Sequence, residues 1–168
     1  MVRAAALVAL AACLAVVPAV ASPGHDRWLV TLDGVRGVRP GLSEAEVERR
    51  LGVTLHPERF GSCTIAFFGS GTDRSHAILW RGRLGSLWFE GDARTDRGIR
   101  IGSSFRQLRR TYPRSTIRKD YYVPAARNVF VRRTRAPHWR LRFDVSPEGR
   151  VTRIAFGNWT VFLVEGCA

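Results

Sequence analysis

Hydrophobic positions along this chain follow two spacings, one typical of helices and one typical of strands. Two stretches, one after Ser43 and one after Ser104, place apolar residues three or four positions apart, which predicts short amphipathic helices. These apolar residues are Val47 and Leu51 in the first stretch and Phe105, Leu108 and Tyr112 in the second. Each serine is followed three residues later by Glu or Gln, as in a capping box, so each helix is expected to begin there. Gly52 and Pro113 are expected to end the two helices.

Stretches rich in β-branched and aromatic residues, separated by turn residues, predict strands after each helix. The predicted strands are 64–68, 76–80 and 83–89 in the first half, and 117–123, 128–133, 139–145, 150–156 and a final 159–164 in the second. Short helices followed by antiparallel strands predict the α+β class. We expect one sheet surface with both helices packed on one face.

A seven-residue motif occurs twice and divides the chain. Residues 37–43 are GVRPGLS, and 61 positions later residues 98–104 are GIRIGSS. Both copies open a predicted helix, so the pattern indicates a duplicated supersecondary unit. We therefore predict two tandem repeats of helix and antiparallel meander, 22–93 and 94–168, that form one compact domain.

The first 21 residues have the pattern of a secretory signal peptide. Arg3 precedes an apolar run from Ala4 to Val17, and Ala-Val-Ala at 19–21 fits a cleavage site. We expect a secreted monomer. The alternative is a lipoprotein anchored through Cys13, because residues 10–13 also fit a lipobox. No later run approaches the roughly 18 to 20 apolar residues of a membrane span, so no transmembrane segment is predicted.

Two cysteines, Cys63 and Cys167, would remain after cleavage. In an oxidising compartment such a pair predicts a disulfide, and the alternative is two buried free thiols. The bridge would join residues 104 positions apart. Chain-entropy estimates for a loop of that length give about 4 to 5 kcal/mol of stabilisation, an upper figure because they ignore strain.

Charge is distributed unevenly between the two halves. Residues 22–93 hold nine arginines and nine acids, whereas residues 94–153 hold sixteen arginines and one lysine against four acids. The formal net charge of +13 therefore belongs to the second half. An anionic partner would be steered toward that half, although charge on a solvated face with no partner is the alternative.

The strand alternation also predicts which side chains face away from the helices. Trp88, Arg140, Arg142 and Arg153 fall on that face, where Arg and Trp would suit a protein interface. The alternative is that a loop covers Trp88 and that the arginines are merely solvated. Arg132 opens a run of basic and aromatic residues of the kind that binds nucleic acid. Export disfavours nucleic acid and favours an anionic wall polymer, an anionic lipid or an acidic secreted protein.

Catalytic and metal-binding signatures are not found. The four histidines lack metal-site spacing, and no G-x-S-x-G elbow is present. Ser70 lies in a glycine-rich turn, and Cys63 is better explained by the disulfide than by nucleophilic catalysis. We predict a protein that is not an enzyme, with no catalytic residues, cofactor or metal.

The paired motif, the short helices, the antiparallel strands and the export signal together resemble the tandem-repeat β-lactamase-inhibitor-protein family. Its single-repeat relatives include the small outer-membrane lipoproteins of the SmpA/OmlA type. The resemblance covers about 34–164 and implies a non-catalytic protein that grips a partner protein with a sheet face. Inhibitors of this family carry one disulfide in each repeat, whereas this chain has one cysteine in the first repeat and one at its end. The alternatives are an envelope-associated protein that binds anionic wall polymer or lipid through the basic second half, and a lipoprotein of the SmpA/OmlA type.

Overall fold

The computed structural model describes residues 27–69, 73–132, 139–163 and 167. The predicted signal peptide, Cys13 and Ser70 lie outside these residues. Among the described residues, eight strands form one antiparallel sheet in the order β2-β3-β4-β5-β10-β9-β8-β7. These strands are β2 (His56–Phe60), β3 (Cys63–Phe67), β4 (His76–Trp80), β5 (Arg83–Phe89), β7 (Thr116–Lys119), β8 (Arg127–Arg132), β9 (Arg140–Val145) and β10 (Val151–Gly157).

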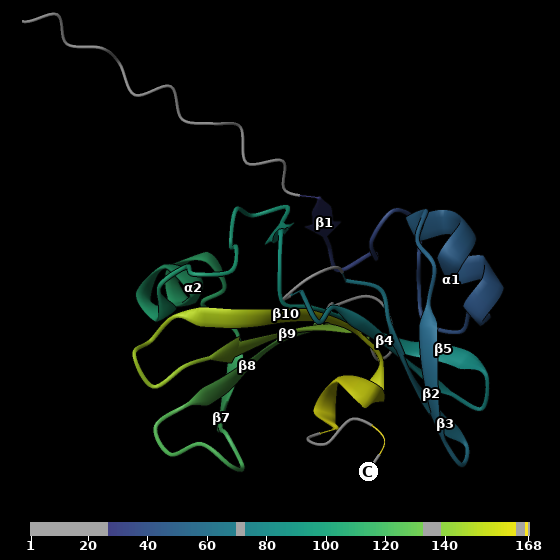
Figure 1. The fold of residues 1–168 in the computed structure, drawn as a ribbon. Helices are drawn as coiled ribbons and strands as arrows, with labels where there is room; N and C mark the ends of the chain where they lie inside the picture. Colours follow the sequence, from purple (N-terminus) through teal and green to yellow (C-terminus); the bar gives the residue numbers. More distant parts are fainter. Residues whose placement is uncertain (1–26, 70–72, 133–138, 164–166, 168) are drawn as a thin grey trace, which may run out of the picture.

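Two helices lie on one face of this sheet, α1 (Glu44–Leu51) and α2 (Phe105–Thr111), as Figure 1 shows. A short parallel pair, β1 (Trp28–Val30) with β6 (Ala93–Thr95), lies on the same side. The α+β class predicted from the sequence is therefore correct. Strand β2 was not predicted, because its sequence HPERF is polar and contains proline, which strands tolerate at a sheet edge.

The two halves of the chain meet at the centre of the sheet. Strand β5 closes the first half and pairs with β10, which closes the strands of the second half, with Phe156 opposite Leu87. Each half thus contributes one helix and four neighbouring strands, and the outermost strands are β2 and β7. The sheet curves away from the helices at both ends (Figure 1).

Both helices begin at the predicted serines. The Glu46 carboxylate accepts hydrogen bonds from the Ser43 backbone N–H (2.8 Å) and hydroxyl (2.7 Å), and these bonds lower its pKa. In α2, the Gln107 backbone N–H donates to the Ser104 hydroxyl at 3.2 Å. Gly52 ends α1 with a left-handed φ of 68°.

The main core lies between the sheet and the helices. It includes the fully buried side chains of both halves, among them Trp28, Phe89, Leu108, Phe143 and Phe156. A second, smaller cluster lies on the opposite face of the sheet. It consists of Cys63, Ile78, Trp88, Phe130, Ala155 and Val161. The centre of the sheet is therefore buried on both faces.

The C-terminal residues supply the cover on that second face. A 3₁₀-helix, η1 (Trp159–Phe162), replaces the strand predicted over 159–164. The Asn158 side chain explains this difference, because it accepts a hydrogen bond from the Thr160 backbone N–H (3.0 Å) and caps a helical turn. The predicted disulfide is confirmed: Cys63 on β3 is bonded to Cys167, with their Cα atoms 5.4 Å apart.

Candidate binding face

Two of the predicted binding residues, Trp88 and Arg142, form a covered group, and the other three are partly or fully exposed. Trp88 and Arg142 are each only 3% exposed, so the expectation that they form an open binding face is wrong. The physical reason is η1 and the residues around it, which cross the middle of this sheet face (Figure 1). Arg153 is partly exposed, Arg140 is partly buried and Arg132 is exposed.

In the covered group, Arg142 uses its whole guanidinium inside the protein. Its Nε donates to Asp144 Oδ1 at 2.6 Å, and Nη2 donates to Asn128 Oδ1 at 3.1 Å. Its Nη1 donates to the carbonyls of Val161 (2.8 Å) and Leu163 (3.3 Å). A buried arginine is tolerated when its charge is paired and its donors are satisfied. Arg142 therefore fastens the C-terminal segment to the sheet and is not available to a partner.

Rings and cations from neighbouring strands stack in a row across the covered group. His76 lies parallel to Trp88, with ring centroids 5.8 Å apart and an interplanar angle of 7°. The guanidinium carbons of Arg142 and Arg153 lie 4.8 and 5.6 Å from the Trp88 ring centre. Burial lowers the pKa of His76, whose Nδ1–H donates to the Arg74 carbonyl at 3.0 Å. This row is packed structure rather than a recognition surface.

Close backbone contact lets η1 lie against the sheet. The Thr160 hydroxyl donates to the Ser86 hydroxyl at 2.8 Å. A Cβ on Gly85 would meet the Thr160 side chain at 2.5 Å, so a side chain there would push η1 outward. The covered group thus has a cover that fits it closely.

The exposed group lies toward the β7 end of the same sheet face. Arg118 and Arg140 place their guanidinium carbons 5.0 and 4.8 Å from the Phe162 ring centre. Burial lowers the pKa of Arg140, and the positive charges of Arg132 and Arg118 lower it further. We call Arg118, Arg132, Arg140 and Phe162 the basic edge.

The basic edge shares Arg140 and Phe162 with an aromatic hollow. This hollow has a volume of about 500 Å³ and is lined by Pro40, Gly41, Trp139, Arg140, Asn158, Trp159 and Phe162. Trp159 packs edge-on against Trp80, with ring centroids 5.4 Å apart. A concave site with aromatic walls and a few polar groups has the general character of a binding site. Sequence reasoning missed Arg118, although alternation along β7 would have placed it on this face.

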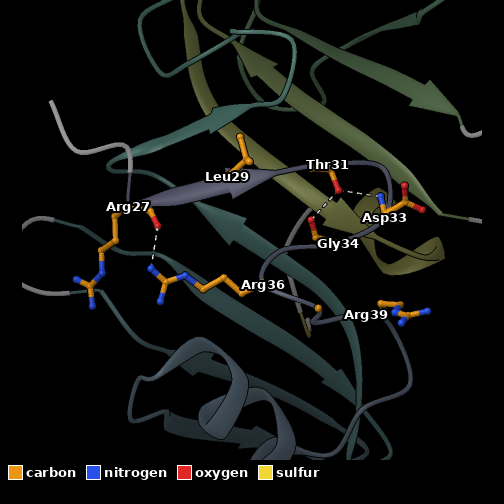
Figure 2. Close-up of a pocket in the computed structure, with 8 residues that line it drawn as sticks. Arg27, Leu29, Thr31, Asp33, Gly34, Arg36 and Arg39 are labelled. Atoms are coloured by element: carbon orange, nitrogen blue, oxygen red, sulfur yellow. Dashed lines mark hydrogen bonds between the residues drawn. The ribbon is translucent and has the colours of Figure 1, made fainter. Parts of the chain in front are cut away.

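A second hollow, of about 710 Å³, lies beside β1 (Figure 2). Arg27, Arg36 and Arg39 are among its lining residues. Arg36 is engaged structurally, because it donates to the carbonyls of Leu51 (3.2 Å) and Arg27 (3.5 Å). The guanidinium carbons of Arg27 and Arg36 also lie 5.0 and 5.1 Å from the Trp28 ring centre. Two of the three arginines thus support the fold, which makes this hollow the weaker candidate.

The described residues show neither a metal-ligating cluster nor a membrane-spanning helix. No group of three or more His, Cys, Asp or Glu side chains among them could hold a metal ion. No helix in the described part of the chain is long and apolar enough to cross a membrane. His138 lies outside the described residues.

Comparisons with known proteins identify the fold alone. No family model and no curated protein matches the chain. An extracellular protein containing a SCP domain, from Bacillus anthracis, is 6% identical with a TM-score of 0.50, and the match covers 71% of this chain and 44% of that one. A cysteine-rich secretory protein from Staphylococcus aureus is 11% identical with a TM-score of 0.49, and the match covers 74% of this chain and 46% of that one. A DUF4309 family protein from Bacillus subtilis is 8% identical with a TM-score of 0.49, and the match covers 69% of this chain and 78% of that one. The matched region is thus less than half the length of each of the first two proteins. The resemblance to the inhibitor family stays a prediction.

Proposed function

We propose that this chain is an exported, non-catalytic binding protein that holds an acidic partner protein against its basic edge. The single observation that carries the proposal is the basic edge itself. Arg118 and Arg140 flank the Phe162 ring there, Arg132 adds a third positive charge that acts on Arg140, and a hollow with aromatic walls lies beside them. A carboxylate-bearing partner would relieve the repulsion, and Arg and Trp are the residues most often found at the energetic centre of interfaces.

Export is supported by the disulfide and by the N-terminal sequence. Disulfides form and persist in oxidising compartments, and the Cys63–Cys167 bridge joins distant parts of this fold. The fold is also shared with a protein described as extracellular. Secretion after cleavage near Ala21 therefore remains our proposal, with lipid attachment at Cys13 as the alternative.

A tandem repeat of the inhibitor-like type is part of the proposal. In its support, each copy of the seven-residue motif leads into a serine-capped helix, and each helix is followed by strands of its own half. We infer that the two halves arose by duplication and that the boundary lies near residue 93. The binding surface we propose belongs to the second half and to the C-terminal segment.

A matched pair of charge reversals tests this proposal. Arg118→Glu with Arg132→Glu changes the basic edge, whereas Arg106→Glu with Arg110→Glu changes two exposed arginines on α2, on the other side of the sheet. Both variants lose the same net charge. We expect the immobilised protein to capture an acidic partner from the producer's secreted proteins, with at least about tenfold weaker capture by the first variant only. Equal capture by both variants would contradict the proposal.

The second candidate function is binding to an anionic wall polymer, and the net charge of +13 favours it. Binding to a flexible polyanion depends on the number of charges more than on their arrangement, and salt screens it strongly. Retention on immobilised polyphosphate that falls equally in both charge-reversed variants, and disappears near about 0.5 M salt, would favour this candidate. Capture that persists at that salt and depends on Arg118 and Arg132 would favour the protein partner.

A further inference from the structure

The hairpin between β7 and β8 exposes an unusual run of apolar side chains at its tip. Tyr121 is 78% exposed, Tyr122 is 54% exposed and Val123 is 46% exposed. The two tyrosine rings touch edge-on, with centroids 4.8 Å apart. Contiguous exposed apolar surface on a protein commonly marks an interaction site. We call residues 120–126 the hairpin tip.

Hydrogen bonds fix the hairpin tip in this shape. The Asp120 carboxylate accepts from the backbone N–H groups of Tyr122 and Val123, both at 3.0 Å. Its other oxygen accepts from Asn128 Nδ2 at 3.3 Å, and the Asp120 backbone N–H donates to the Ala126 carbonyl at 3.1 Å. The strand predicted over 117–123 therefore ends at Lys119, because Asp120 turns the chain with its side chain. The tyrosines are held outward by a preorganised turn.

The base of the hairpin tip is positively charged. Lys119 and Arg127 are directly opposite each other across β7 and β8, a like-charge pair that costs stability. Within the described residues, no carboxylate lies within ion-pair distance of either. Asp120, the nearest acid in the sequence, is occupied by the hydrogen bonds inside the tip. Lys119 is exposed, whereas Arg127 is half-buried, with its guanidinium carbon 4.9 Å from the Phe105 ring centre. Two exposed tyrosines and a valine thus extend beyond one exposed cation and one that is packed against α2.

We propose that the hairpin tip docks the protein on an anionic lipid bilayer. Tyrosine is enriched at the interface between membrane and water, where its ring lies among the acyl chains and its hydroxyl remains hydrated. Basic residues just behind inserted apolar side chains are attracted to anionic headgroups. Tyr121, Tyr122 and Val123 would enter the interface while Lys119 contacts the headgroups and Arg127, stacked on Phe105, adds to the positive potential behind them. This inference goes beyond the proposed partner binding and does not depend on it.

The outermost hairpin at the other end of the sheet offers a matched control. At the end of β2, Phe60 is 50% exposed, but its neighbours include both an acid and a base, Glu58 and Arg59. Arg59 also lies 3.9 Å from the Glu44 carboxylate. That hairpin therefore presents an exposed ring without an excess of positive charge. Phe60→Ser removes an exposed ring from a site where we propose no docking.

Sedimentation with vesicles tests the proposal. We expect the wild-type protein to sediment with vesicles of phosphatidylglycerol and phosphatidylcholine and to bind vesicles of pure phosphatidylcholine much more weakly. Tyr121→Ser with Tyr122→Ser should weaken binding to the anionic vesicles about tenfold or more, because the buried apolar area is lost while the charge is unchanged. Phe60→Ser should leave binding within about twofold of wild type.

Three results would overturn the docking proposal. These are failure of the wild-type protein to bind anionic vesicles, unchanged binding by the tyrosine variant, and equal loss in the tyrosine and Phe60→Ser variants. If the tyrosine variant instead loses a captured protein partner and the wild type does not bind vesicles, the tip is a protein contact. The proposed function is tested separately, by partner capture with the Arg118 and Arg132 variants, so the two proposals can be judged independently.

Discussion

The covered group and the basic edge lie on the same sheet face and are built from the same residue types, yet one is buried and the other meets solvent. In the covered group, Arg142 stacks on Trp88 and donates to two carbonyls of the C-terminal segment. In the basic edge, Arg118 stacks on Phe162 but remains exposed to solvent. Whether an arginine beside an aromatic ring is buried or available at the surface therefore depends on what covers it.

The largest expected effect comes from removing the centre of the covered group. We expect Arg142→Ala to lower the free energy of unfolding by about 3 to 5 kcal/mol, because Asn128 and two carbonyls lose their donor and Asp144 keeps only Arg153. Chemical denaturation measures this loss. Arg132→Ala in the basic edge is the matched control, and its unfolding free energy should change by no more than about 0.5 kcal/mol. Equal losses of unfolding free energy in the two variants would contradict the view that only the covered group stabilises the fold.

Removing the bridge that anchors the cover should have the next largest effect. We expect Cys63→Ala with Cys167→Ala to lower the free energy of unfolding by about 2 to 4 kcal/mol, because the unfolded chain gains entropy. Near-ultraviolet circular dichroism should also change, since Trp88 lies beneath the segment that the bridge holds. If stability and the tryptophan signal both match those of the oxidised wild type, the bridge does not secure the cover.

A smaller effect should follow the protonation of His76 in the row of stacked rings. Burial lowers its pKa in the folded state, so below the ordinary value the unfolded chain binds more protons than the folded one. The free energy of unfolding should therefore be highest above about pH 6.5 and should fall as the pH is lowered below that value. His76→Phe keeps a ring on Trp88 and should reduce this dependence, measured by denaturation at several pH values. If the variant keeps the same pH dependence, His76 is not its source.

The smallest effect on stability is expected at the basic edge. Arg118→Glu with Arg132→Glu should change the free energy of unfolding by less than about 1 kcal/mol, because both side chains are exposed and exposed cation–π contacts are weak. Thermal denaturation beside the Arg106→Glu with Arg110→Glu control checks this. A much larger loss of stability would show that the basic edge is structural, like the covered group.

Much of the fold could be predicted because its signals are local. The serine caps placed both helices, and alternation placed β4 and β5 at the residues where the structure has them. Strand β2 was missed because an edge strand with proline and charges lacks an apolar pattern. The helical turn at 159–162 was missed because its aromatic residues suit a strand, and only the Asn158 cap distinguishes the two.

The binding face was predicted less well because covering is not a local property. Alternation correctly put Trp88, Arg140 and Arg142 on one face, but a segment at the end of the chain decides which of them meet solvent. The disulfide could be predicted from its two cysteines, and it showed that residue 167 lies near β3. The position of η1 over Trp88 could be known only from the structure.

The most direct test of the central claim is capture of a secreted partner by the two matched charge-reversed proteins. The claim is that the basic edge recognises a partner while the covered group only supports the fold. Capture should fall at least about tenfold for Arg118→Glu with Arg132→Glu and stay near wild type for Arg106→Glu with Arg110→Glu, with both proteins folded. Equal capture by the two variants, whether retained or lost, would contradict the claim.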